Sequence, residues 1–336
     1  MTRRRASGFT LIEMLVAVAI LGIVVVGVLE TFTVQNRAYT VVDETTEAQQ
    51  NLRAIAYLIE RDLRSTGFMV EEGAAACGVD NTNQPDTLFV TDTEPVNPEK
   101  AATAALGATV VAGYASSVSE QYLVLDDVVI DRDAAPADAY FDTSGDGVPD
   151  SDFAVGRGAI LVDTSNPGRG TACGLITDVN AAGNSVRVDF QNFITATGAT
   201  LVLVPAVGYS IQPDVNGVPT LLRNGIALAS DVEDLQVAYF IDIDENGQVT
   251  TASEYPGSDL SPVDYAAKDT DHSKLREIRF NIVVRSRNTD PSYSEGFEQA
   301  TENRGVVGAN DGFRRRVFTS TVRPRNIGYR GVGASG

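Results

Sequence analysis

The sequence predicts an α+β protein in which one long N-terminal α-helix packs on an antiparallel β-sheet domain with long loops. Three observations lead to this fold class: an apolar run near the N-terminus, an apolar stripe with helical spacing after it, and short β-like runs over most of the remaining chain. With 336 residues, 43% of them hydrophobic and 21% charged, the chain can form one or two globular units.

The apolar run extends from Phe9 to Leu29 and is interrupted only by Thr10 and Glu13. As a helix, these 21 residues would be about 30 Å long, enough to cross the hydrocarbon core of a membrane. The arginines in the segment before it, residues 1–8, predict a cytoplasmic N-terminus by the positive-inside rule. A secretory signal peptide would end in a cleavage site with small residues. The sequence after the run offers no such site, so we expect the helix to be retained.

We expect the helix to continue as an amphipathic segment over residues 30–67. Neither Gly nor Pro interrupts the chain from Gln35 to Thr66. Apolar residues keep a three-to-four spacing at Ala38, Val41, Ala48, Leu52, Ile55, Ile59 and Leu63. This stripe predicts that the second half of the helix packs on a globular domain.

Beyond the helix, β-like runs alternate with turn-rich segments, which predicts a β-rich globular domain over residues 68–326 and a flexible tail over residues 327–336. An antiparallel sheet against the helix is the expected arrangement. Strands are expected at residues 87–91, 121–130, 159–163, 174–179, 185–190, 200–204, 209–212, 220–223, 235–242, 277–286 and 316–322. Long loops are expected at residues 67–86, 92–118, 132–156 and 287–312.

Glu13 is the most unusual residue of the apolar run. A charged carboxylate in the hydrocarbon core costs about 2.5–3.5 kcal/mol. The sequence therefore predicts that Glu13 has a partner. The alternative is that its side chain snorkels to the membrane surface or is protonated.

The sequence GFTLIE at residues 8–13 resembles the processing motif of type IV prepilins. The resemblance implies a pilin-like fold in which residues 9–29 form both the membrane anchor and the filament core. It also implies that a membrane prepilin peptidase cleaves between Gly8 and Phe9 and methylates the new amine of Phe9, so that residues 1–8 are a leader. In the filament, Glu13 of one subunit would neutralise this amine on a neighbour and fix the axial register, because unpaired buried charges are costly.

Shorter motifs resemble minor pilins of the PilW type: NLR at residues 51–53, DLR at 62–64, LLR at 221–223, VEDLQV at 232–237 and RRRVFTSTV at 314–322. The resemblance implies a minor pilin that initiates or supports pilus assembly near the tip. Its partners would be other major and minor pilins, the prepilin peptidase and an inner-membrane assembly platform.

The resemblance also implies a location in the inner membrane before assembly, as a single-pass protein with a cytoplasmic N-terminus. After assembly the protein would lie in the periplasm and the cell-surface pilus. Two alternatives stay open at this point: a type II secretion pseudopilin, and a tip adhesin or surface-binding module.

The two cysteines, Cys77 and Cys173, are expected to form a disulfide, because an even number of cysteines in a chain that crosses a membrane permits one in an oxidising compartment. Their spacing does not resemble a zinc motif. The single histidine, His272, cannot complete a usual zinc site without carboxylate ligands.

Two acidic loops are candidate calcium sites, since they carry oxygen-bearing side chains at alternate positions around a glycine. The first has Asp142, Ser144, Asp146, Val148, Asp150 and Asp152. The second and weaker one has Asp242, Asp244 and Asn246. The alternative for the first loop is a solvated acidic turn, and a hairpin turn at Asn246-Gly247 explains the second loop equally well. Ca²⁺ is thus a candidate ligand, and no cofactor is required.

Charge and motif content exclude several function classes. The formal charge is −19, and removal of the three arginines in residues 1–8 would leave −22, so nucleic acid is not an expected partner. The adjacent Arg314, Arg315 and Arg316 are expected to alternate between solvent and carboxylate partners. The sequence has no nucleotide-binding glycine loop after a strand, and neither cysteine has a base nearby in sequence. We therefore expect a structural protein and not an enzyme.

Overall fold

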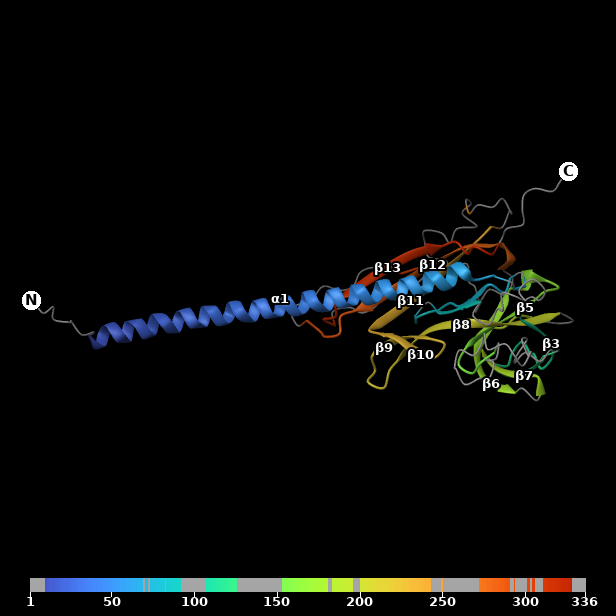
Figure 1. Cartoon of the computed structure of the whole chain (residues 1–336), viewed down its shortest axis with the longest axis horizontal. Helices are drawn as coiled ribbons and strands as arrows, with labels where there is room; N and C mark the ends of the chain where they lie inside the picture. Colours follow the sequence, from blue (N-terminus) through green and yellow to red (C-terminus); the bar gives the residue numbers. More distant parts are fainter. Residues whose placement is uncertain are drawn as a thin grey trace, which may run out of the picture. The chain divides into compact units, whose positions relative to one another are not determined.

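The computed structural model describes residues 10–68, 70–71, 73–81, 83–91, 107–125, 153–180, 183–195, 200–242, 249, 272–290, 293, 301–302, 304–305 and 311–327. The chain divides into two compact units, Met1–Gln49 and Gln50–Gly336. One long helix, α1 (Leu11–Ser65), contributes to both units. Figure 1 shows it as an unbroken ribbon.

In the first unit, the apolar side chains of α1 lie on the surface. Leu11 is 81% exposed and Ile23 is 75% exposed. A helix that is apolar on all sides is stable when it is surrounded by lipid or by other helices. The length and composition of α1 would allow it to cross a membrane, as the sequence predicts.

In the second unit, α1 packs through one face. Leu52, Ile55, Ile59 and Leu63 are all buried, which confirms the apolar stripe expected from their spacing. The helix ends at Ser65, two residues before the predicted end.

The end of α1 is held by the C-terminal segment of the chain. The backbone N–H of Arg325 donates to the carbonyl of Arg64 at 3.3 Å, and the side-chain amide of Asn326 donates to the carbonyl of Ser65 at 3.0 Å. These bonds satisfy two of the carbonyls that a helix leaves unpaired at its C-terminus. Gly67 then turns the chain with a φ of 81°, a conformation that favours glycine.

Two antiparallel sheets follow α1 in the described part of the chain. The larger one contains β1 (Ala76–Val79), β2 (Thr87–Thr91), β3 (Ala108–Ala112), β4 (Glu120–Leu125), β5 (Gly158–Asp163), β6 (Thr171–Asn180), β7 (Ser185–Phe190), β8 (Leu201–Pro213), β9 (Pro219–Arg223) and β10 (Ile226–Ser230). The smaller one contains β11 (Val232–Ile241), β12 (Leu275–Arg285) and β13 (Arg315–Val322). Short 3-10 helices occur at η1 (Pro167–Arg169) and η3 (His272–Lys274).

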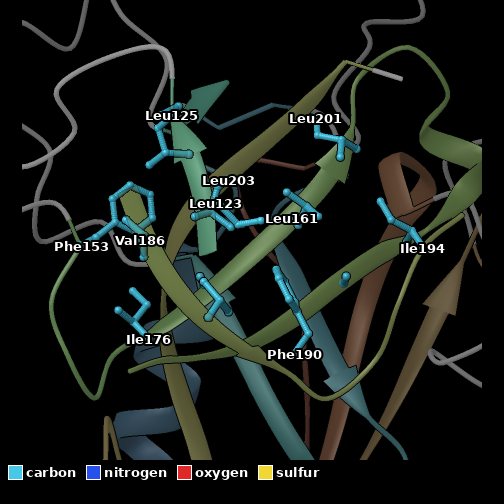
Figure 2. Packing of buried hydrophobic residues seen from close by; sticks show 14 residues of the cluster. Leu123, Leu125, Phe153, Leu161, Ile176, Val186, Phe190, Ile194, Leu201 and Leu203 are labelled. Carbon is cyan, nitrogen blue, oxygen red and sulfur yellow. The ribbon is translucent and has the colours of Figure 1, made fainter. Parts of the chain in front are cut away.

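Six strands of the larger sheet close into a small barrel. The first half of β8 pairs with β3 on one edge and with β5 on the other, and β4, β7 and β6 complete the circle. Buried apolar side chains fill the interior, among them Leu123, Leu161, Phe190 and Leu203, which gather between the strands in Figure 2. The barrel is therefore a packed core and closes the edges of its own strands.

The second half of β8 leaves the barrel and joins what we call the arm, which also contains β1, β2, β9 and β10. Figure 1 shows β8 continuing from the barrel strands toward β9 and β10. β2 pairs with one edge of β8 and β9 with the other. Thr91 at the end of β2 pairs with Ala206 of β8. The chain therefore enters and leaves the barrel at neighbouring positions.

The smaller sheet is connected to the arm through the segment before β2. The backbone N–H of Asp86 donates to the carbonyl of Leu235 at 2.8 Å, and the side chain of Gln236 donates to the carbonyl of Gln84 at 3.0 Å. These bonds continue the hydrogen bonding of β11 into the arm.

The predicted fold class is confirmed, with corrections to its strands. The domain has two sheets where one was expected. β1 and β3 lie in segments 67–86 and 92–118, which were expected to be loops, and β10 was not predicted. The runs at 200–204 and 209–212 are parts of one strand, β8.

Two residues explain why β8 was divided in the prediction. Pro205 lacks a backbone N–H, and a proline usually predicts the end of a strand. In the structure it lies within β8, opposite Ala159 of β5. Gly208 is the second residue that predicts an interruption of the strand. A Cβ atom there would lie 3.0 Å from the ring of Phe89, so the glycine makes room for this buried side chain.

Candidate processing and assembly site

A capping box between Thr10 and Glu13 organises the start of α1. The backbone N–H and the hydroxyl of Thr10 both donate to the same Glu13 carboxylate oxygen, each at 2.9 Å. The backbone N–H of Glu13 donates back to the Thr10 hydroxyl oxygen at 3.4 Å. The carboxylate is thereby held at the N-terminal end of the helix, where the helix dipole favours negative charge.

Glu13 is the only charged residue of α1 before Glu30. Its neighbours are apolar and exposed, with Ile12 at 70% and Met14 at 63%. In the part of the chain that the structure describes, no Lys, Arg or His side chain forms an ion pair with Glu13. The arrangement presents one carboxylate at the start of an otherwise apolar helical surface.

The residues predicted to flank the cleavage site, Gly8 and Phe9, lie outside the described residues, so cleavage and methylation stay predictions. Thr10 was not among the predicted site residues. Its sequence signal is the Thr-x-x-Glu pattern of a capping box before an apolar run.

Cys77 and Cys173 form a disulfide with a Cα–Cα distance of 6.1 Å, which is the pairing expected from the sequence. Cys77 lies on β1 and Cys173 on β6, so the bond joins the arm to the barrel. The buried Asn192 supports this junction. Its side-chain oxygen accepts the backbone N–H of Cys173 at 2.7 Å, and its amide donates to the carbonyl of Thr171 at 3.2 Å.

A second polar cluster anchors the last turns of α1 to the arm. Asp62 is only 6% exposed, although it lies on a helix face that is otherwise apolar. Its carboxylate accepts a hydrogen bond from the Tyr209 hydroxyl at 2.6 Å and forms ion pairs with Arg223 and Arg61, each at 2.9 Å. Burial first, and then the Asp62 carboxylate, raise the pKa of Tyr209, so that its hydroxyl stays protonated and donates.

This cluster was not predicted. The sequence does carry one signal for it, because Asp62 follows Ile59 at a spacing of three and therefore falls on the buried stripe. A buried carboxylate in that position requires partners from the sheet.

Of the residues in the two candidate calcium loops, only Asp242 is among the described residues. Residues 142–152 lie outside the described residues, and so do Asp244 and Asn246. Asp242 is fully buried and forms an ion pair with Arg276 at 2.8 Å. Among the described residues, no group of three or more His, Cys, Asp or Glu side chains is placed to hold a metal ion.

The three adjacent arginines at residues 314–316 depart from the expected alternation, because two neighbours both pair with carboxylates. Arg315 is buried against Glu233 and Asp311, with its guanidinium bonded to both carboxylates. Arg314 forms an ion pair with Asp290 at 2.9 Å, and Arg316 is exposed. Two of the three charges are thus already satisfied within the chain.

Comparison with known proteins gives two family matches. Residues 3–29 match the prokaryotic N-terminal methylation motif, and residues 208–326 match type IV pilus-assembly protein W. The second match begins in β8 and includes β9 to β13. Both families are those of pilin-type structural proteins and not of enzymes.

No curated protein sequence matches the chain. Among solved structures, a type IV-like pilin from Thermus thermophilus is similar, with 11% sequence identity and a TM-score of 0.32. The similarity covers 83% of this chain and 97% of that pilin. The chain thus carries the prokaryotic N-terminal methylation motif and, over residues 208–326, a region similar to type IV pilus-assembly protein W.

Proposed function

We propose that this protein is a minor type IV pilin that is cleaved between Gly8 and Phe9 and then built through α1 into a pilus, where it initiates or supports assembly near the tip. The observation that carries the proposal is α1 itself, an exposed apolar helix with one carboxylate held at its start. The methylation-motif match supports processing of the N-terminus. The match to a pilus-assembly family favours a pilus over a type II secretion pseudopilus.

In this proposal, Glu13 pairs with the methylated amine of a neighbouring subunit. Both groups would lie in a bundle of apolar helices, where either charge is costly when it is unpaired. A subunit that enters out of register would leave both charges without a partner. The Thr10 cap assists by holding the carboxylate at the N-terminal end of the helix.

The barrel supports the proposal that each pilus contains only a few copies of this protein. It is inserted between β2 and β8 and enlarges the domain beyond the region matched by the family model. An enlarged subunit is harder to repeat at every position of a filament than at its end. Before assembly, α1 would anchor the protein in the inner membrane, with the sheet domain in the periplasm where the disulfide can form.

Mass spectrometry of sheared surface filaments and of the membrane fraction tests this function. We expect a methylated Phe9 terminus and a small amount of the chain relative to the major pilin. An abundance similar to the major pilin would exclude a minor role, and an intact Met1 or Thr2 terminus would exclude processing.

Two matched variants test the role of Glu13. Glu13→Gln removes the charge with little change of shape, and we expect the protein to be processed but absent from filaments. Glu30→Gln makes the same change at the next charged residue of α1, and we expect normal incorporation. Incorporation of both variants to the same extent would rule out the pairing of Glu13.

A further inference from the structure

We propose that the outer edge of β10 is a docking site at which an extended, uncharged segment of a different pilin subunit adds a strand to the arm. The proposal rests on the proposed function, because it needs the chain to stand beside other pilins. It concerns the sheet domain and adds a contact that the helix interaction does not supply.

β10 is an edge strand. It pairs with β9 on one side, and no strand in the described part of the chain pairs with its other side. The two strands are joined by Asn224 and Gly225, whose φ angles of 53° and 73° are typical of a tight hairpin turn. The residues that flank such a turn, Arg223 and Ile226, bond each other. The next residue, Ala227, therefore directs its N–H and C=O groups away from β9, toward an added strand.

The side chains of β10 leave this edge open. All five residues, IALAS, are uncharged, and none is proline, so this strand lacks two of the usual protections of a strand edge, charge and proline. Ile226 is 74% exposed and Leu228 is 38% exposed. The pairing of β10 with β9 shifts register between Ala227 and Ala229, and a bulge of this kind limits an added strand to a short length.

The edge is held rigidly, which lowers the cost of ordering it in a complex. Asn224 ties the hairpin to β8 by two bonds to Gly208: its backbone N–H donates to the Gly208 carbonyl at 2.8 Å, and its side-chain oxygen accepts the Gly208 N–H at 2.9 Å. Arg223 connects the same hairpin to Asp62 on α1 at 2.9 Å. The edge is therefore fixed to the part of α1 that lies in the same compact unit.

The net charge of the chain and the uncharged side chains of β10 indicate which segment can bind at this edge. Two copies of a chain with a formal charge of −19 repel each other, so a second copy is a poor partner. A charged residue placed against Ile226 and Leu228 would lose water without gaining an opposite charge, so the added segment must be uncharged. Strand addition draws its affinity from main-chain hydrogen bonds and its selectivity from such side-chain contacts. A less acidic pilin subunit with an uncharged free edge meets these conditions.

Photocrosslinking in cells tests the proposal with the full-length protein. A photoreactive residue replaces Ile226, and the matched control carries it at Val215, which is 100% exposed but lies in the turn between β8 and β9. We expect the Ile226 probe to crosslink to another pilin, identified by its own methylated N-terminal peptide, with a yield about tenfold above that of the Val215 probe. Equal yields at the two positions, or a product containing only a second copy of this chain, would overturn the proposal.

A charge on the edge gives a second test. In the chain with the Ile226 probe, Leu228→Lys should lower the yield about tenfold, because a lysine on a strand edge blocks strand addition. Val215→Lys should leave the yield unchanged. A yield that survives Leu228→Lys would overturn the proposal. Filament content of the protein is measured in the same cells: absence from filaments with the crosslink retained would contradict the proposed function, whereas normal filament content without the crosslink would contradict only the docking site.

Discussion

Replacement of Asp86 by Asn should change how the stability of the protein depends on pH. Asp86 is buried where the arm meets the smaller sheet. One of its side-chain oxygens accepts the backbone N–H of Asn81 and the other accepts that of Val237, both at 2.8 Å. Burial raises the pKa of Asp86 from 3.8 to about 8, although both hydrogen bonds favour the charged form. The carboxylates of Asp80 and Asp234 raise it further.

The sign of the effect follows from this raised pKa. Above pH 3.8 the unfolded chain releases the Asp86 proton, whereas the folded chain keeps it until the pH approaches 8. The stability that this proton contributes is complete below pH 3.8 and is lost as the pH rises to about 8. At about 1.4 kcal/mol per pH unit, loss of the Asp86 contribution alone should lower the unfolding free energy by about 4 kcal/mol between pH 5 and pH 8.

Asp86→Asn removes the ionisation and should flatten this slope. It also turns an amide NH₂ toward one of the two backbone N–H groups, and the lost hydrogen bond should cost about 1–2 kcal/mol. The variant should therefore be less stable than the wild type below pH 3.8, about equally stable near pH 5 and more stable at pH 8. Urea unfolding of the full chain in detergent at several pH values measures both curves.

Asp214→Asn is a control, because the pKa of Asp214 is shifted in the opposite direction to that of Asp86. Asp214 is exposed, and the backbone N–H of Val218 is the main cause that lowers its pKa, so its contribution is lost only as the pH falls below 3.8. This variant should keep the wild-type slope between pH 5 and pH 8. If the wild type and Asp86→Asn gave parallel curves of unfolding free energy against pH, the carboxyl group of Asp86 would not be neutral in the folded protein.

Three further predictions concern the polar cluster, the disulfide and the calcium loop. Tyr209→Phe should lower the unfolding free energy by about 1–3 kcal/mol in urea, because Asp62 stays buried but loses a donor. Replacement of Cys77 and Cys173 by Ser should cost about 3–5 kcal/mol in the same assay, since the disulfide closes a separation of 96 residues. Titration calorimetry of the full chain should detect Ca²⁺ binding that Asp146→Asn abolishes.

Each of these predictions has a control or a contrary outcome. Tyr57→Phe removes a hydroxyl from a side chain that is 69% exposed and should leave stability unchanged, so equal effects of the two Tyr variants would contradict the role given to Asp62. Reduction of the wild-type disulfide should reproduce the serine variant, and a stable reduced protein would contradict its contribution. Heat of binding that is the same in the wild type and Asp146→Asn would place any calcium site elsewhere.

The helix and most strands could be predicted from the sequence because their signals are local. The spacing of Leu52, Ile55, Ile59 and Leu63 repeats every turn, and each of these side chains is buried as expected. β1 and β3 lacked such a signal, since each has only four or five residues and lies among turn residues.

The barrel and the Asp62 cluster depend on contacts between distant residues. Tyr209 is 147 residues from Asp62 in sequence and Arg223 is 161 residues away, so no local pattern connects them. Closure of the barrel likewise requires β8 to pair with β3 and β5, which lie well before it in the chain. The Thr10 cap is different, because its pattern is local and is readable in the sequence.

The pairing of Thr91 with Ala206 means that the barrel occupies the place of a hairpin loop between β2 and β8. Because the two ends of the insertion are neighbours, the barrel could be exchanged for a short turn without separating these strands. The helix α1 and the barrel can therefore change independently during evolution. The disulfide to β6 gives the barrel a second attachment, so that it does not swing on the connection through β8 alone.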